Sequence, residues 1–373
     1  MEISIKIAQN IATFSIEWDM FLPSQHHLKS INLQAFENSH IDDIDNNYVQ
    51  VFLKEKLIGI LYLQQFNFAH QHLNFGKRNS FFISALKLFL PIKLSILVCG
   101  QLFRINYQGF YFKDPAHNPL VLEAINLFIQ QQETCQPCGI MIKDCSEVFI
   151  EQNSRHFGYQ FFNGDVTMEI NRRAHWLTFN DYLTDLNKKY RKRANKILQS
   201  FSAIDKQLLT ADQILEQATA IEKLYWNVVQ KQAVKLGTVN IQYFYELKTS
   251  VGNNFEFHAL YLHGKMVGFY TFIFYETTME THYIGLDYET NKTANIYFNI
   301  LFEGIKTMVE RQYNSLELGR TAKEAKISAG ALPKQIINYI RIKNPVIKFA
   351  VNYFLNRFNK KENQFTINRN PLK

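Results

Sequence analysis

Six basic side chains occupy the nine positions from Lys188 to Lys196, in the stretch LNKKYRKRANK. Such groups pair with phosphates or carboxylates. Apolar residues at spacings of three, four and seven predict a single amphipathic helix over residues 180–201. On that helix Arg193 lies about 20° from Leu186, inside the apolar stripe. A guanidinium drawn toward a core needs an anion, so we predict Arg193 as a binding residue and the other cations as surface charge. The alternative is that Arg193 reaches past the stripe to a surface carboxylate.

A second group with anion-binding chemistry lies in LGRTAKEAK, residues 318 to 326. A strand ends at a glycine, and Arg320 and Thr321 then begin a short predicted helix that contains Lys326. Side chains and free amides together at such a point form a site for an anion or a carbonyl oxygen. The alternative is a capped turn in which Arg320 pairs with Glu317 or Glu324.

A candidate general base lies in the predicted strand METHYIGLDY, residues 279 to 288. Strand alternation places Glu280, His282 and Ile284 on one face and Tyr283 and Gly285 on the other. An unperturbed histidine titrates near neutral pH, so we predict His282 as the base. The alternative is a structural histidine.

These groups sit on elements that recur along the chain. VFLKEKLIGILYL, from Val51, aligns with LYLHGKMVGFYTF, from Leu260, and each reads as strand, turn, strand. A helix and a further strand follow both copies: PLVLEAINLFIQQ with GIMIKD, and NIYFNILFEGIKTMVERQ with SLELGR. The alternative is chance alignment of apolar strands. The repeat predicts an α+β fold of two units, 1–170 and 171–340, each a mixed, mostly antiparallel sheet flanked by helices. Residues 341–373 are predicted as a basic amphipathic helix and tail.

Composition predicts a folded protein with anionic partners. The 373 residues are 47% hydrophobic and 14% aromatic, with a net charge of +8 and a pI near 9.1. The first residues, MEISIKIAQNIATFSIEWDMF, lack the regions of a secretory signal, so we expect a cytoplasmic protein. CQPC, from Cys135, lies between a helix and a strand, which is the wrong end of a helix for a redox pair. We predict no metal site.

The order of elements resembles the GNAT acyltransferase fold in tandem, as in Fem-type peptidoglycan-bridge ligases and BioF2-like acetyltransferases. YLTDLNKKYRKRANKILQ looks like the basic helix that opens their second unit, and LELGRTAKEAKISAGA like their final strand and Gly-Arg-Thr turn. The resemblance implies an N-acyltransferase that moves an acyl group from acyl-CoA to an amine of a small molecule or a cell-envelope precursor.

The resemblance also fixes the expected site in the second unit. Tyr297 is expected to protonate a thiolate leaving group, and Tyr190 and Asn295 complete the predicted substrate- or phosphate-binding set. No segment completes the pyrophosphate motif of acetyl-CoA enzymes, and RHFGYQ at Arg155 comes nearest.

Other donors, partners and functions stay open from the sequence. Aminoacyl-tRNA is the alternative donor, although residues 200–255 show no long heptad run for a coiled-coil arm. A function of another class is RNA binding by the basic helix without catalysis. Residues 344–365 predict a helix that docks on the second unit or rests on an anionic membrane, which suits a lipid-linked acceptor.

Overall fold

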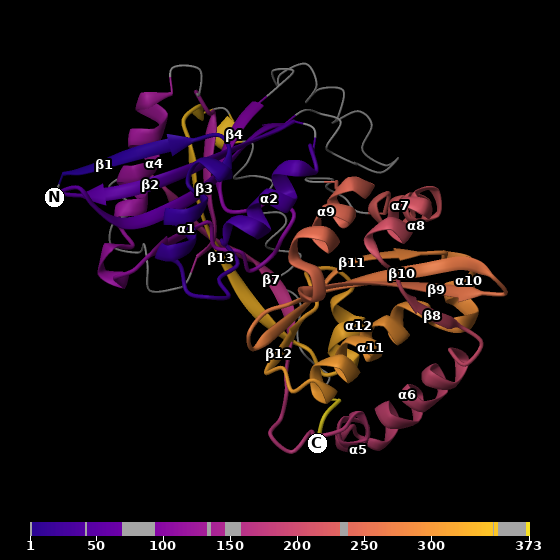
Figure 1. Cartoon of the computed structure of the whole chain (residues 1–373). Helices are drawn as coiled ribbons and strands as arrows, with labels where there is room; N and C mark the ends of the chain where they lie inside the picture. Colours follow the sequence, from indigo (N-terminus) through magenta and orange to yellow (C-terminus); the bar gives the residue numbers. More distant parts are fainter. Residues whose placement is uncertain are drawn as a thin grey trace. The chain divides into compact units, whose positions relative to one another are not determined.

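The computed structural model describes residues 2–41, 43–68, 94–132, 136–145, 158–231, 238–345, 347–349 and 371–373, with the backbone alone for 161–165. These residues belong to two compact units (Figure 1). Unit 1 comprises Met1–Asp165, Gln232–Val239 and Gln335–Gln364, and unit 2 comprises Val166–Lys231, Asn240–Lys334 and Phe365–Lys373. Each unit is therefore assembled from separate segments of the chain. The units predicted from the sequence, 1–170 and 171–340, were each continuous. The helix expected over 344–365 lies mostly outside the described residues.

The sheet of unit 1 has the strand order β1-β2-β3-β4-β6-β13, with β5 paired to β3. These strands are β1 (Ile3–Ala8), β2 (Ile44–Leu53), β3 (Lys56–Phe68), β4 (Leu94–Cys99), β5 (Phe110–Phe112), β6 (Gly139–Cys145) and β13 (Leu332–Ile342). The helices are α1 (Ser15–Phe21), α2 (Ser30–Asn38) and α4 (Leu120–Gln131). Strand alternation separates two cores. Tyr48 and Ile60 pack in one cluster with residues of α1 and α2, and Val49 and Leu61 in another with α4.

The sheet of unit 2 has the order β7-β12-β11-β10-β9-β8. Its strands are β7 (Gln160–Asn171), β8 (Asp205–Leu208), β9 (Phe255–Leu262), β10 (Lys265–Phe274), β11 (Thr278–Leu286) and β12 (Ser315–Glu317). Its helices are α5 (Phe179–Asp185), α6 (Lys188–Ser200), α7 (Ala211–Glu216), α8 (Ala218–Val229), α9 (Ile241–Val251), α10 (Tyr288–Ala294), α11 (Ile296–Glu310) and α12 (Lys323–Ser328). Helices α7, α8 and α9 cover one face of the sheet, and α5, α6 and α11 lie on the other (Figure 1).

The two hairpins of the predicted repeat are both present in the structure. In unit 1 Val51 pairs with Gly59 and Leu53 with Lys56, and in unit 2 Leu260 pairs with Gly268 and Leu262 with Lys265. The aligned residues thus hold the same register, and each hairpin has a bulge between those two pairs. Both turns place two residues at positive φ, as tight hairpin turns require.

The α+β class with two units, each a mixed sheet flanked by helices, is therefore confirmed, with one topological addition. Strand β7 follows the first repeat but pairs with β12 in unit 2, and β13 follows the second repeat but pairs with β6 in unit 1. Each repeat thus supplies its last strand to the other unit's sheet. Among the described residues, no helix is long and apolar enough to cross a membrane.

Candidate functional site

Two carboxylates face each other where two parallel strands of unit 2 separate. β11 and β12 pair over Thr278–Ser315, Met279–Leu316 and Glu280–Glu317, and no later pair follows among the described residues. Beyond this point the Leu318 amide donates to Met168 of β7, while β11 continues beside β10. Glu280 and Glu317 are each only 8% exposed. Side-by-side buried carboxylates are costly, so this point of separation is the first candidate site.

Glu317 is held by one carboxylate oxygen. Its Oε1 accepts hydrogen bonds from the Gly319 amide at 2.8 Å and from the Thr167 hydroxyl. Its Oε2 is buried and has no partner in the described part of the chain. Burial raises the pKa of Glu317 to about 7; the two hydrogen bonds oppose the rise and the Glu280 charge adds to it. One free oxygen and a near-neutral pKa suit a general base.

Lys326 lies beside this carboxylate on α12 and is 3% exposed. Its Nζ donates to the Gly319 carbonyl at 3.0 Å, so Gly319 bonds both ionisable side chains. Burial lowers the pKa of Lys326 to about 7, against the opposing effect of the Glu317 charge. The structure thus places an acid and a base with near-neutral pKa values together, which is a frequent feature of catalytic sites.

His282 is part of the same polar group but is enclosed. Its Nδ1 lies 2.7 Å from Glu280 Oε1 and its Nε2 lies 2.7 Å from the Tyr243 hydroxyl, and its side chain is 1% exposed. The Glu280 carboxylate favours a proton on Nδ1, which leaves Nε2 to accept from the Tyr243 hydroxyl. Both ring nitrogens of His282 therefore have partners, and His282 orients neighbouring groups.

The predicted alternation along this strand is wrong because β11 is irregular. Its register with β10 shifts between Thr281 and Ile284. His282 and Tyr283 consequently both contact Tyr243 of α9, and Ile284 packs with the core cluster that contains α11. A bulge adds a residue to one strand, and the residues beyond it change faces.

The predicted burial of Arg193 is also wrong. The chain forms two helices, α5 and α6, with a break at Leu186 and Asn187, and α5 is capped by Thr178. The stripe that contained Arg193 depended on one continuous helix. Arg193 is exposed, with its guanidinium 4.7 Å from the centre of the Phe298 ring. The buried positions of α6 are Ala194 and Ile197.

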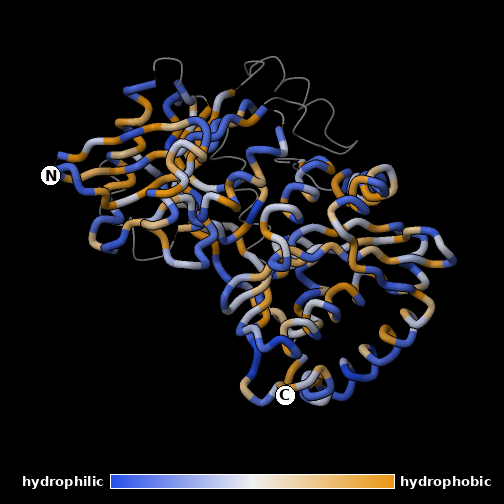
Figure 2. The backbone as a smooth tube through the Cα atoms, in the orientation of Figure 1, coloured by the Kyte–Doolittle hydropathy of each residue, from blue (hydrophilic) through white to orange (hydrophobic). Residues whose placement is uncertain are grey.

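The exposed cations of α6 form one basic surface. Lys188, Lys189, Lys192, Arg193 and Lys196 are exposed. None of them pairs with a carboxylate among the residues that the structure describes. Hydrophilic residues dominate this helix, which lies at the rim of unit 2 (Figure 2). Tyr190 is half-buried on the opposite side and packs against the unit 2 core.

Asn295 and Tyr297 lie where α6 ends and α11 begins. Asn295 Nδ2 donates to the Ser200 hydroxyl at 3.0 Å, and the Tyr297 amide donates to Asn291 Oδ1 at 2.8 Å. The Tyr297 hydroxyl is buried without a partner among the described residues, and burial raises the pKa of Tyr297. With Arg193 these residues form a second group, apart from the carboxylates.

Arg320 and Thr321 are exposed and precede α12, which begins at Lys323 after Ala322 at a φ of 52°. The expectation that the helix starts at Arg320 is therefore wrong by three residues. Lys326 and His282 are brought together through the two carboxylates. Arg320 follows this group directly in the chain.

Sequence reasoning missed the pairing of Glu280 with Glu317, and the contacts of Thr167 and Tyr243. The available signal was an acidic residue within the apolar run Leu316-Glu317-Leu318, at an expected strand position. Among the described residues no group of histidines, cysteines and carboxylates could hold a metal.

A cavity of about 640 Å³ lies in unit 1 and is distinct from these groups. Its walls include Glu37, His40, Asn46 and Phe128. No residue predicted for the site lines it.

Comparison with known proteins shows the fold and the family. FemX has a TM-score of 0.55 at 11% identity, covering 94% of this chain and 100% of that chain. A conserved protein of unknown function from Bacteroides thetaiotaomicron VPI-5482 has a TM-score of 0.54 at 12% identity, covering 91% of this chain and 100% of that chain. L-PGS from Bacillus licheniformis has a TM-score of 0.50 at 11% identity, covering 84% of this chain and 88% of that chain. At such identities the likeness concerns the fold alone.

No curated protein matches the sequence. Residues 133–371 match the model of a family described as FemAB-like, peptidoglycan biosynthesis/recognition. This match extends over more than half of the chain and includes the paired carboxylates, the basic helix and α12. The chain therefore belongs to the FemAB-like family and is a transferase related to peptidoglycan.

Proposed function

We propose that unit 2 is an N-acyltransferase that acylates an amine of a peptidoglycan precursor. The observation that carries this proposal is the pair Glu317 and Lys326 at the separation of β11 and β12. Acyl transfer to an amine needs a group that removes a proton from the attacking ammonium and a group that stabilises the oxyanion. A buried carboxylate with one free oxygen and a buried ammonium beside it provide both.

In the proposed reaction the Glu317 carboxylate takes a proton from the acceptor ammonium. The neutral amine attacks the donor carbonyl, and the Lys326 ammonium stabilises the oxyanion that forms. Collapse of this intermediate forms the amide and breaks the bond to the leaving group, which takes a proton from the Lys326 ammonium. The neutral Lys326 amine then takes the second proton from the attacking nitrogen. Glu280 and His282 hold the site together, and Arg320 and Thr321 bind the polar ends of a substrate.

The donor is the finer part of the proposal, and two observations favour aminoacyl-tRNA over acyl-CoA. The amide of Tyr297, in the first turn of α11, already donates to Asn291, and only Asn295 separates α10 from α11. A CoA pyrophosphate needs free amides at such a helix start. The exposed cations of α6 suit a longer polyanion. Our proposal therefore reverses the order of donors that the sequence suggested.

Non-enzymatic RNA binding is the second candidate function, because the same basic surface supports it. A ligand comparison separates the candidates. The intact protein is mixed with CoA, acyl-CoA, uncharged tRNA or aminoacyl-tRNA, and melting temperature and amide formation on a peptidoglycan precursor are measured.

We expect aminoacyl-tRNA to support transfer, and Glu317→Gln to abolish transfer without loss of tRNA binding. Glu310→Gln, at an exposed position on α11, is the matched control. Binding of tRNA with no transfer from any donor would favour the RNA-binding candidate. Transfer from acyl-CoA alone would show that acyl-CoA is the donor, as predicted from the sequence, and would contradict the proposal of aminoacyl-tRNA.

A further inference from the structure

The break between α5 and α6 is held by a short segment from far along the chain, Pro371–Lys373. The Asn187 amide donates to the Pro371 carbonyl at 2.8 Å, and Leu186 forms a β-bridge with Leu372. The Lys373 amide donates to the Asp185 carbonyl at 2.9 Å. This segment, here called the strap, therefore forms hydrogen bonds with Asp185 and Asn187, on either side of Leu186.

The break needs such partners because its backbone is not helical. Leu186 has φ −66° and ψ 138°, and Asn187 has φ −54° and ψ 146°. The Leu186 amide keeps its bond to the Tyr182 carbonyl, whereas the Asn187 amide loses the bond that a continuous helix would supply. With the strap in place, the Asn187 amide and the Asp185 carbonyl are hydrogen-bonded to it as in an antiparallel β-bridge. Without the strap, these two groups form hydrogen bonds with water instead. The direction of α6 relative to α5 is then less restricted.

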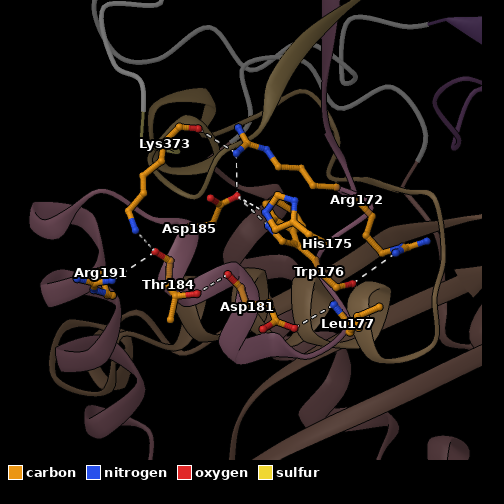
Figure 3. Close-up of polar contacts among 10 residues, drawn as sticks. Arg172, His175, Trp176, Leu177, Asp181, Thr184, Asp185, Arg191 and Lys373 are labelled. Atoms are coloured by element: carbon orange, nitrogen blue, oxygen red, sulfur yellow. Dashed lines mark hydrogen bonds and ion pairs between the residues drawn. The ribbon is translucent and has the colours of Figure 1, made fainter.

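Asp185 anchors the same junction from the other side (Figure 3). Its Oδ2 accepts from Arg173 at 2.7 Å and from Trp176 Nε1 at 2.9 Å, and lies 3.1 Å from His175 Nε2. Arg173 also donates to the Lys373 carbonyl at 2.9 Å. Trp176 is fully buried, so the junction and the strap are joined to the unit 2 core.

The strap also reaches the element that carries Lys326. The Leu372 side chain packs over Gly330, just after α12, where an added Cβ would lie 3.1 Å from Leu372 Cδ1. Gly330 has a φ of 96°, which other residues rarely adopt. The Tyr182 hydroxyl of α5 donates to the neighbouring Ala329 carbonyl at 2.9 Å. One short segment thus touches both the base of α6 and the end of α12.

We propose that the strap positions the basic helix α6 and the Lys326 helix α12 relative to each other, with Asp185 and Leu372 as positioning residues. This inference rests on the proposed function, in which α6 binds the anionic donor and Lys326 acts on its carbonyl. Both elements must be fixed together for the donor to meet the base.

The test uses the full chain with Leu372→Ala and Asp185→Asn. The matched controls are Leu177→Ala, whose side chain is 65% exposed, and Asp212→Asn, on the exposed side of α7. Hydrogen exchange of α6 amides is measured without ligand, and affinity for unmodified tRNA is measured at fixed salt. We expect both strap variants to raise α6 exchange and to weaken tRNA binding about tenfold, as when the competent state falls to about a tenth.

The controls should change neither quantity. Unchanged α6 exchange in both strap variants overturns the proposal. If the wild-type protein does not bind tRNA, the proposed donor fails, whereas exchange still tests the strap. If Leu372→Ala does not fold, Asn187→Ala replaces it, because this variant removes the side-chain bond to the Leu372 carbonyl at 3.3 Å.

Discussion

The two units share one frame and differ at a single pair of positions that matters for chemistry. In unit 1 the parallel strands β4 and β6 pair Val98 with Met141, and in unit 2 the equivalent strands β11 and β12 pair Glu280 with Glu317. The hairpins fix this equivalence, because both place the preceding strand in the same register. In unit 1, apolar residues occupy the equivalent strand positions. We therefore expect that unit 2 does not need its carboxylates for folding.

The units also differ just beyond this pair. In unit 2 two residues separate Thr281 from Ile284, and the strand continues. In unit 1 a loop over 100–109 lies between β4 and β5, and Lys143 donates to its Gln101 and Arg104 carbonyls at 3.0 and 2.7 Å. At its base an added Cβ on Gly109 would lie 2.1 Å from the Gly100 amide nitrogen. Unit 1 thus has a loop and the buried Lys143–Asp144 ion pair near the place where unit 2 keeps Glu317 and Lys326, and we expect unit 1 to have a supporting role.

The largest expected effect comes from giving unit 2 the residues of unit 1. Glu280→Val with Glu317→Met should lower the rate of transfer about 10²- to 10⁴-fold, since the proposed base is lost. When Lys326→Met is added to this variant, the free energy of unfolding should stay equal or rise by about 1–4 kcal/mol, because apolar packing replaces the buried charges and no ammonium is left without its partner. Steady-state kinetics and urea unfolding measure these quantities. A double variant that keeps its activity would remove both carboxylates from the mechanism.

The reciprocal change should affect stability instead. Val98→Glu puts a carboxylate at a site that is 1% exposed, and should cost unit 1 about 3–5 kcal/mol. Val98→Leu is the size control and should cost much less. Urea unfolding of unit 1, followed by hydrogen exchange, measures the difference. Equal tolerance of glutamate in both units would contradict the view that unit 2 is specialised for charge.

The pH dependence should show the two near-neutral groups. Glu317 has its pKa raised from 4.5 to about 7, so the stability it contributes is complete below about pH 4.5 and is lost as pH rises through 7. Lys326 has its pKa lowered from 10.5 to about 7, so its contribution is complete above about pH 10.5 and is lost as pH falls through 7.

Together these two groups predict a minimum in the free energy of unfolding near pH 7, relative to a Glu317→Gln and Lys326→Met double variant. Denaturant unfolding from pH 4.5 to 10 measures this difference. The rate of transfer should be bell-shaped about the same pH, because the base must be ionised and the ammonium protonated. A constant difference across this range would show that the two groups are not coupled to folding.

The smallest effects should come from the basic helix. Arg193 and Lys192 are both exposed, so Arg193→Ala and Lys192→Ala should each weaken tRNA binding by only about two- to fivefold. Each should also lower the slope of log affinity against log salt by about one. Anisotropy titrations at several salt concentrations test this. A loss of all tRNA binding from Arg193→Ala alone would instead support the prediction from the sequence, in which Arg193 is the binding residue and the other cations are surface charge.

Local patterns predicted much of the fold. The aligned hairpins and the helix-then-strand order after each of them were readable because turn chemistry and apolar periodicity act over a few residues. Lys326 was selected from the chemistry of LGRTAKEAK, and His282 from its residue type. The roles of both stay predictions. Arg193 and the alternation around His282 were misjudged, since a two-residue helix break and a one-residue bulge each rotate everything that follows.

The sequence by itself determined that two similar α+β units exist, and which residue types are available to bind anions and move protons. Only the tertiary structure decided that Glu280 and Glu317 are neighbours. They are separated along the chain by the whole of α11, and parallel pairing through that crossover brings them together. The chemical character of Glu317 follows from the same contact, because burial and the neighbouring Glu280 charge, not residue type, raise its pKa toward neutrality.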